Sequence, residues 1–162
     1  MHKINILLWA ASAAATELQW KIPAFDYHES YTFTTPAHQN SWGYVDFNLT
    51  NNLVPYATPC KAQNNRMFDF YGETPAFACT PPDEAPLGAA ANFRFNKKTG
   101  QLDVEETVVV EGESVLVAGS VNVTLTCTDK TEINENWVIG EVYSQRDVKC
   151  LIPDLVFKGE EV

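Results

Sequence analysis

Residues 92–118 read NFRFNKKTGQLDVEETVVVEGESVLVA, and this stretch decides the fold class. Apolar and polar residues alternate in 92–96 and again in 101–105, as expected for two half-buried β-strands. Between them lies Lys97-Lys98-Thr99-Gly100, a turn in which Gly100 can take the left-handed backbone conformation. The pattern predicts a β-hairpin.

The same signals continue on both sides of this hairpin. Segments 107–110 and 114–118 flank Glu111-Gly112-Glu113, which indicates a second hairpin. Upstream, residues 42–50 (WGYVDFNLT) alternate clearly, and downstream residues 121–128 form the strongest strand pattern in the chain. Because segments of ten or more residues with an unbroken helical period are missing, we predict an all-β fold, a single antiparallel β-barrel or sandwich of short strands.

The rest of the chain fits this class less regularly. Residues 18–25 alternate and then meet Pro23, which predicts an edge strand or the end of a strand. We expect further strands at 27–33, 67–71, 137–143 and 151–157, an irregular segment at 53–66 and a surface loop at 80–91.

Composition narrows the possible functions. The chain has 162 residues, 45% of them hydrophobic, which suits one folded domain with its own core. The formal net charge is -10, so the phosphates of nucleic acids and the headgroups of anionic membranes would repel the surface. We therefore expect neither nucleic acid nor a membrane as a partner.

The first 15 residues predict a signal peptide. Lys3 precedes an apolar run from Ile4 to Ala11, and Ala13-Ala14-Ala15 supplies the small residues at which signal peptidase cleaves. The expected organisation is a signal peptide at 1–15 and a single secreted β-domain at 16–162. The expected location is extracellular.

Four cysteines, a number that pairs evenly, agree with an oxidising compartment. Three pairings are possible, and we favour Cys60 with Cys79 and Cys127 with Cys150, because each cysteine then joins its nearest neighbour along the chain. The wide spacing of the cysteines gives no support for a zinc site, and we expect no metal.

Two N-glycosylation sequons occur in alternating segments, at Asn48-Leu49-Thr50 and Asn122-Val123-Thr124. Their apolar neighbours should face the core, which leaves Asn48 and Asn122 facing solvent. Both asparagines are therefore predicted glycosylation sites.

The sequence offers little to a catalytic mechanism. Beyond the signal peptide it contains only His28 and His38, and it lacks the nucleophile-elbow, zinc-protease and phosphate-loop motifs. We interpret Asp26-Tyr27-His28-Glu29 as a solvated loop with ordinary polar residues. The prediction is a non-catalytic protein without a cofactor, although pairs among the 21 acidic residues leave a secreted hydrolase as an alternative.

Aromatic residues are unusually dense near the N-terminus of the predicted domain. Seven of them lie within 25 residues, more than the core needs from this part of the chain: Trp20, Phe25, Tyr27, Tyr31, Phe33, Trp42 and Tyr44. We take Tyr27, Tyr31 and Trp42 as candidates for an exposed binding patch. Such a patch suits a protein, a flat aromatic ligand or a sugar ring, so a carbohydrate-binding or cell-wall module is a second alternative.

Several segments together resemble the Alternaria major-allergen family of small secreted fungal proteins. Trp20 to Phe25 matches the family's W-x-I-x-x-F opening, and Tyr44 to Asn51 lies where that family has its first core strand. The further matches are Cys60 and Cys79, Phe93-Arg94-Phe95, Leu102 to Glu105, and Val123-Leu125-Cys127 followed by Cys150.

The resemblance implies a secreted antiparallel β-barrel that acts as an allergen, elicitor or effector. Its implied partners are host extracellular proteins, among them thaumatin-like defence proteins, or small flavonoid-type aromatic ligands. This chain has no cysteine before Cys60, whereas the family's prototype has one that links a dimer, and both cysteine loops are longer here. A covalent dimer is therefore not implied.

Processing provides a direct test of the compartment. Protein recovered from culture medium should begin near Thr16, because Ala13-Ala14-Ala15 closes the apolar run. N-terminal sequencing that finds Met1 on the extracellular protein would refute the signal peptide.

Overall fold

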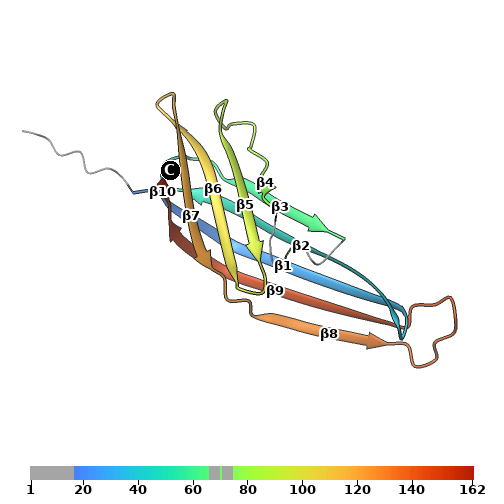
Figure 1. The fold of residues 1–162 in the computed structure, drawn as a ribbon. Coiled ribbons are helices and arrows are strands. Elements are labelled where there is room, and N and C mark those ends of the chain that lie inside the picture. The colour runs from blue at the N-terminus through green and yellow to red at the C-terminus, as the bar shows by residue number, and fades with distance from the viewer. Residues whose placement is uncertain (1–16, 66–69, 71–74) are drawn as a thin grey trace, which may run out of the picture.

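A computed structural model describes residues 17–65, 70 and 75–162 and contains ten strands in this part of the chain (Figure 1). Their bounds are β1 Gln19–Thr35, β2 His38–Asn51, β3 Thr58–Asn64, β4 Phe77–Ala78, β5 Ala90–Asn96, β6 Gln101–Val110, β7 Glu113–Asn122, β8 Cys127–Ile133, β9 Ser144–Lys158 and β10 Glu160–Glu161. The all-β prediction is confirmed.

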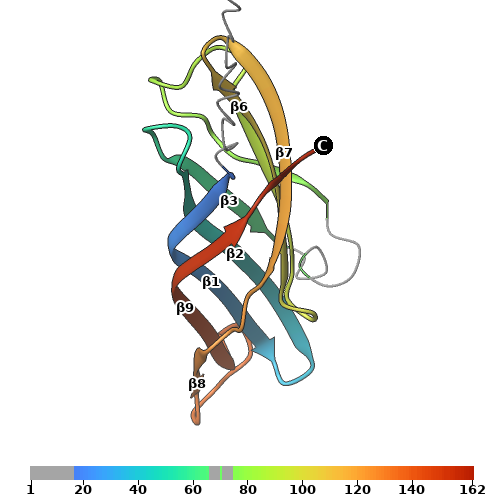
Figure 2. The same cartoon turned by 90° about the vertical axis from the view of Figure 1, so that its left-hand side faces the viewer.

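The strands form two five-stranded sheets in which every pairing is antiparallel. Sheet A has the order β3-β2-β1-β9-β8, and sheet B has the order β10-β7-β6-β5-β4. Sheet B covers only part of sheet A, so β8 and the adjoining ends of β1, β2 and β9 extend beyond it (Figure 2). Sheet A therefore has an inner face, partly covered by sheet B, and an outer face.

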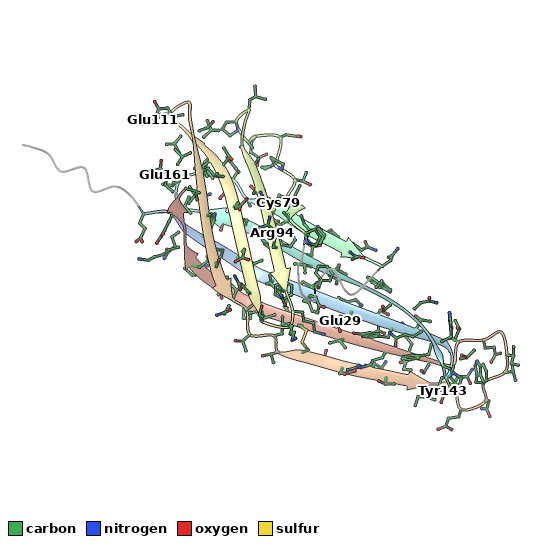
Figure 3. The ribbon with its side chains drawn as sticks, viewed as in Figure 1. Glu29, Cys79, Arg94, Glu111, Tyr143 and Glu161 are labelled. Atoms are coloured by element: carbon green, nitrogen blue, oxygen red, sulfur yellow. A yellow bond between two sulfur atoms is a disulfide. The ribbon has the colours of Figure 1, made fainter. Side chains whose placement is uncertain are left out.

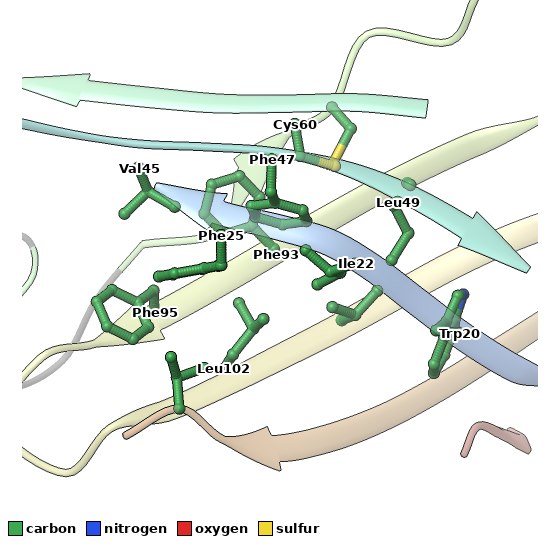
Figure 4. Packing of buried hydrophobic residues seen from close by; sticks show 14 of the residues in the cluster. Trp20, Ile22, Phe25, Val45, Phe47, Leu49, Cys60, Phe93, Phe95 and Leu102 are labelled. Carbon is green, nitrogen blue, oxygen red and sulfur yellow. A yellow bond between two sulfur atoms is a disulfide. The ribbon is translucent and has the colours of Figure 1, made fainter. Parts of the chain in front are cut away.

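Aromatic side chains fill the space between the sheets. Phe25 and Phe47 of sheet A pack with Phe93 and Phe95 of sheet B, with ring centroids 5.0–5.5 Å apart, and all four are buried (Figure 4). Trp20 is also fully buried and lies against Phe157. Each such side chain removes 150–250 Å² of apolar surface from water, so these rings supply much of the driving force for folding.

The inner face of β1 changes phase at Pro23. Trp20 and Ile22 are fully buried before it, and Phe25 and Tyr27 are fully buried after it, so the buried set passes from even to odd residue numbers. The register with β2 shifts by one residue between Lys21 and Phe25, which is the signature of a β-bulge. Pro23 has no backbone N–H to donate to a neighbouring strand, and the bulge accommodates it.

The facing strand β9 is irregular at the same level. Ile22 pairs with Leu155 and Ala24 pairs with Pro153, which leaves Pro23 opposite Asp154, a residue with a positive φ of 51°. The prediction that Pro23 marks an edge strand or a strand end is therefore wrong. The strand β1 lies at the centre of sheet A and continues through the bulge.

Both predicted disulfides are confirmed. Cys127 and Cys150 are direct partners on β8 and β9, so this bridge links an outer strand to its neighbour in sheet A. Cys60 lies on β3 and Cys79 follows β4, so the second bridge joins sheet A to sheet B.

The two predicted hairpins are confirmed, and their turns contain the expected conformations. Gly100 has a φ of 74° in the turn between β5 and β6, and Gly112 has a φ of 87° between β6 and β7. The expected loop at 80–91 is also present up to Ala89, after which β5 begins. The predicted strand at 67–71 lies outside the described residues except for Phe70, which is buried.

Three other local predictions are wrong. The segment 53–66 contains β3, an edge strand whose exposed position tolerates Pro59. The predicted strand at 121–128 is divided, since β7 ends at Asn122 and β8 begins at Cys127 as the chain passes from sheet B to sheet A. Residues 137–143 form a loop, closed by its own backbone hydrogen bonds.

The carboxyl group of Glu106 is buried between the two sheets, where its hydrogen-bond partners are neutral side chains. The side chain of Glu106 on β6 accepts hydrogen bonds from Trp20 Nε1 at 2.5 Å and from Asn51 Nδ2 at 3.0 Å. Burial raises the pKa of Glu106, and these two hydrogen bonds offset only part of the increase. The hydroxyl of Tyr56 is also buried. Burial raises the pKa of Tyr56, and the negative charge of Glu106 raises it further.

Replacing Glu106 by glutamine should increase the free energy of unfolding near neutral pH. Because the pKa of Glu106 is raised, the folded state holds this proton more tightly than the unfolded chain does. The stability of the wild type therefore falls as pH rises from the ordinary pKa of a glutamate through the raised pKa of Glu106. Glutamine keeps an oxygen for Trp20 and Asn51 but carries no charge. Urea unfolding should therefore show a gain at about pH 7 that disappears below about pH 4.

The exposed Glu113 on the neighbouring strand provides the control for this measurement. Glu113→Gln should leave the free energy of unfolding unchanged at both pH values. The raised pKa would be contradicted if the gain in stability of Glu106→Gln over the wild type were no larger at pH 7 than at low pH.

Candidate functional site

The three residues predicted to form one aromatic patch lie on opposite faces of sheet A. Tyr27 is fully buried on the inner face, where it contacts Phe70 and Phe95, so its prediction as an exposed anchor is wrong. Tyr31 lies four residues further along the same face and is half-buried. Trp42 pairs with Ser30 and so projects from the outer face, where it is 37% exposed.

The segment 26–29, interpreted above as a solvated loop, runs through the centre of β1. Its alternation directs Asp26 and His28 to the outer face and Tyr27 and Glu29 to the inner face. His28 and Glu29 are both buried. The polar residues of this segment therefore belong to two separate clusters, and composition alone did not reveal their burial.

On the outer face, three rings form a compact cluster. His28 packs against both Trp42 and Tyr44, with ring centroids 5.1 and 5.2 Å away, and the centroids of Trp42 and Tyr44 lie 6.1 Å apart. Its Nε2 is 3.8 Å from a carboxylate oxygen of Asp147, and its Nδ1 is buried with no hydrogen-bond partner among the described residues. Contacts with Trp42 and Tyr44 thus hold the imidazole in place, while Trp42 itself stays partly exposed. We name His28, Trp42 and Tyr44 the aromatic cluster.

The aromatic cluster adjoins two shallow hollows of about 310 and about 400 Å³, both lined by Asp26 and Leu151. The Tyr44 hydroxyl donates a hydrogen bond of 3.1 Å to Asp26, and the ammonium group of Lys61 lies 3.0 Å from Asp46. Burial and the hydrogen bond to Asp26 raise the pKa of Tyr44, so its hydroxyl remains a donor at neutral pH. The outer face therefore combines exposed apolar surface with fixed polar groups.

On the inner face, Glu29 is the centre of a buried polar network (Figure 3). Its carboxylate accepts hydrogen bonds from the hydroxyls of Tyr27 at 2.5 Å and Tyr31 at 2.8 Å, and it forms an ion pair with Lys97 from the β5–β6 turn. Burial alone would raise the pKa of Glu29, but these hydrogen bonds and the charge of Lys97 together lower it. The network holds the carboxylate ionised and links the two sheets.

The Glu29 network explains why Tyr27 and Tyr31 are present in such an aromatic segment. A buried carboxylate needs donors, and a tyrosine supplies a donor together with a ring that fits the core. The signal in the sequence was the alternation Tyr27, Glu29, Tyr31, which places all three on one face of a strand.

Both sequon asparagines are exposed, so the predicted outward orientation of Asn48 and Asn122 is confirmed. Asn48 lies on the outer face of sheet A and lines one of the two hollows. Glycosylation at either residue stays a prediction.

The described part of the chain lacks both a cluster of metal ligands and a helix that could cross a membrane. In residues 17–65, 70 and 75–162, three or more potential metal ligands nowhere gather closely enough to hold an ion. Helices of the length and hydrophobicity needed to cross a bilayer are also missing from these residues.

Fold and surface together define a class: a two-sheet, disulfide-linked, all-β protein with an aromatic cluster on the outer face of one sheet. A comparison with protein-family models matches residues 22–150 to the family described as Alternaria alternata allergen 1. This match spans most of the chain, and the protein therefore belongs to that family. Searches among curated proteins and among solved structures returned no match.

Replacing Lys97 by methionine should destabilise the protein by about 1–3 kcal/mol at neutral pH, because it leaves the buried Glu29 carboxylate without its cation. Because the pKa of Glu29 is lowered in the folded protein, its ionised carboxylate stabilises the fold at pH values above the ordinary pKa of a glutamate. This stabilisation is lost as the pH falls through the lowered pKa of Glu29. The cost should therefore shrink in acid, where Glu29 takes up a proton. Urea unfolding at several pH values measures both effects.

Lys98 lies in the same turn and is exposed, so Lys98→Met is the matched control and should change stability little. An equal effect of the two substitutions, or a Lys97→Met cost that grows in acid, would contradict the role assigned to Glu29.

Proposed function

We propose that this protein acts outside the cell as a non-catalytic binding protein that holds a basic host protein against the outer face of sheet A. The observation that carries the proposal is Trp42, a partly exposed tryptophan held in place by stacking beside His28 and Tyr44. Tryptophan and tyrosine are the residues most enriched among energetically dominant contacts at protein interfaces, and a fixed ring loses little entropy on binding.

Charge supports the choice of a basic partner. The outer face itself has mixed charges, with Lys61 beside Asp46 and Lys21 beside Asp154. The net charge of the whole chain is -10, and this long-range field would attract a basic protein and accelerate its association. Family membership makes a thaumatin-like defence protein of the host the first partner to test.

The structural roles of the chemically active side chains support a non-catalytic function. Glu29 is held ionised by Lys97 inside the sheet A network, and Glu106 accepts hydrogen bonds from core residues. Neither residue lines the two hollows of the outer face. His28 packs against Trp42 and Tyr44, and its side chain is buried.

Trp42→Ala should weaken binding to a purified basic thaumatin-like protein by about 1–3 kcal/mol, or roughly tenfold to a hundredfold in Kd. The cause is the loss of the exposed ring, which titration calorimetry would measure directly. Affinity of the wild type should also fall as salt rises, since attraction between the charged surfaces is screened over about 10 Å at 0.1 M ionic strength.

Leu116→Ala provides the control, because Leu116 is a similarly exposed apolar residue of β7 in the other sheet. This variant should bind like the wild type. If Trp42→Ala folds normally and binds as tightly as the wild type in both low and high salt, the outer face of sheet A is not the binding site.

A further inference from the structure

The loop between β8 and β9 exposes apolar side chains at the far end of sheet A, away from the C-terminus (Figure 1). Ile139 is 91% exposed and Val138 is 59% exposed, and Ile133 and Val142 at the two ends of the loop are also exposed. Single exposed apolar residues are common, but four exposed within ten residues are a concentration of apolar surface of the kind that marks an interaction site.

The loop has a defined conformation because its own groups hold it. The backbone N–H of Asn134 donates to the carbonyl of Tyr143 at 2.8 Å, and the N–H of Glu141 donates to the carbonyl of Val138 at 3.1 Å. The indole N–H of Trp137 donates to the Glu141 carbonyl at 2.9 Å, and its ring packs edge-on against Tyr143 at 5.8 Å. This loop, residues 134–143, thus uses its two aromatic rings internally.

That internal packing determines which residues are displayed. Trp137 and Tyr143 pack against each other and are half-buried. The chain reverses at Gly140, which has a φ of 104°, and Val138 and Ile139 are left exposed at the tip. The loop is also anchored to sheet A, since the N–H of Tyr143 donates to the carbonyl of Phe33 at 2.8 Å. A tip that is already ordered loses little conformational entropy when it enters a pocket.

The charges around the tip indicate what kind of pocket would receive it. Residues 131–145 contain Glu132, Glu135 and Glu141 and no lysine, arginine or histidine. Glu132 is paired with Lys130 at 2.5 Å, which leaves Glu135 and Glu141 as the acidic rim nearest the tip. An anionic membrane would repel this rim, and loops that insert into bilayers ordinarily carry basic residues beside their apolar ones.

We propose that the loop 134–143 is a second docking element, which inserts Val138 and Ile139 into an apolar pocket of a protein partner whose rim carries lysine or arginine. The apolar tip supplies the desolvated centre of the contact, and the two glutamates supply complementary charge at its edge. This inference goes beyond the outer-face site, because the loop lies past the end of the strands and involves none of the aromatic cluster.

The test uses the full chain with a photo-crosslinking benzoylphenylalanine in place of Ile139, exposed to host extracellular fluid and analysed by mass spectrometry of the linked peptides. Leu87 is a similarly exposed aliphatic residue in the separate loop 80–89 and provides the matched crosslinker position. We expect a product from position 139, absent from position 87, whose linked partner residues are apolar and lie beside lysine or arginine.

Binding to that identified partner should fall about tenfold or more for Ile139→Asp and remain unchanged for Leu87→Asp. Glu135→Lys should also weaken it, because this substitution reverses one charge of the rim. Four results would overturn the proposal: no product from position 139, the same products from both positions, a product made of two copies of this chain, or flotation with phosphatidylcholine vesicles that Ile139→Asp abolishes.

Discussion

The paired irregularity at Pro23 and Asp154 sets the orientation of every later side chain on β1 and of the facing part of β9. A strand presents alternate residues to opposite faces, so one extra residue exchanges the two faces beyond it. Before the irregularity Trp20 and Ile22 point inward, and after it Phe25 and Tyr27 do so. Because β1 and β9 change phase together, their pairing continues without interruption and sheet A stays intact.

The consequence is a separation of polar groups between two environments. Glu29 is directed inward, where Tyr27, Tyr31 and Lys97 satisfy it and connect the sheets. The adjacent His28 is directed outward, where it supports Trp42. Without the change of phase, the histidine would meet the core and the glutamate would face solvent, so both the inner network and the proposed binding face depend on the irregularity.

Much of this architecture could be predicted from the sequence, because its signals are local. The turn at Gly100 and the four cysteines predicted a hairpin and two bridges that the structure contains. The phase of β1 could not be predicted in the same way, since Pro23 is equally compatible with a strand end and with a bulge. The density of aromatic residues predicts an exposed position for Tyr27, whereas its hydroxyl donates to the buried carboxylate of Glu29 two residues away.

The arrangement of faces can be measured most directly by hydroxyl-radical footprinting of the folded protein, read out residue by residue by mass spectrometry. The account predicts rapid oxidation of Trp42 and Leu151 on the outer face of sheet A, and protection of Trp20 and Tyr27 until the protein is unfolded with guanidinium. Oxidation of Tyr27 in the folded protein at the rate of Trp42 would contradict the change of phase at Pro23 and the binding face derived from it.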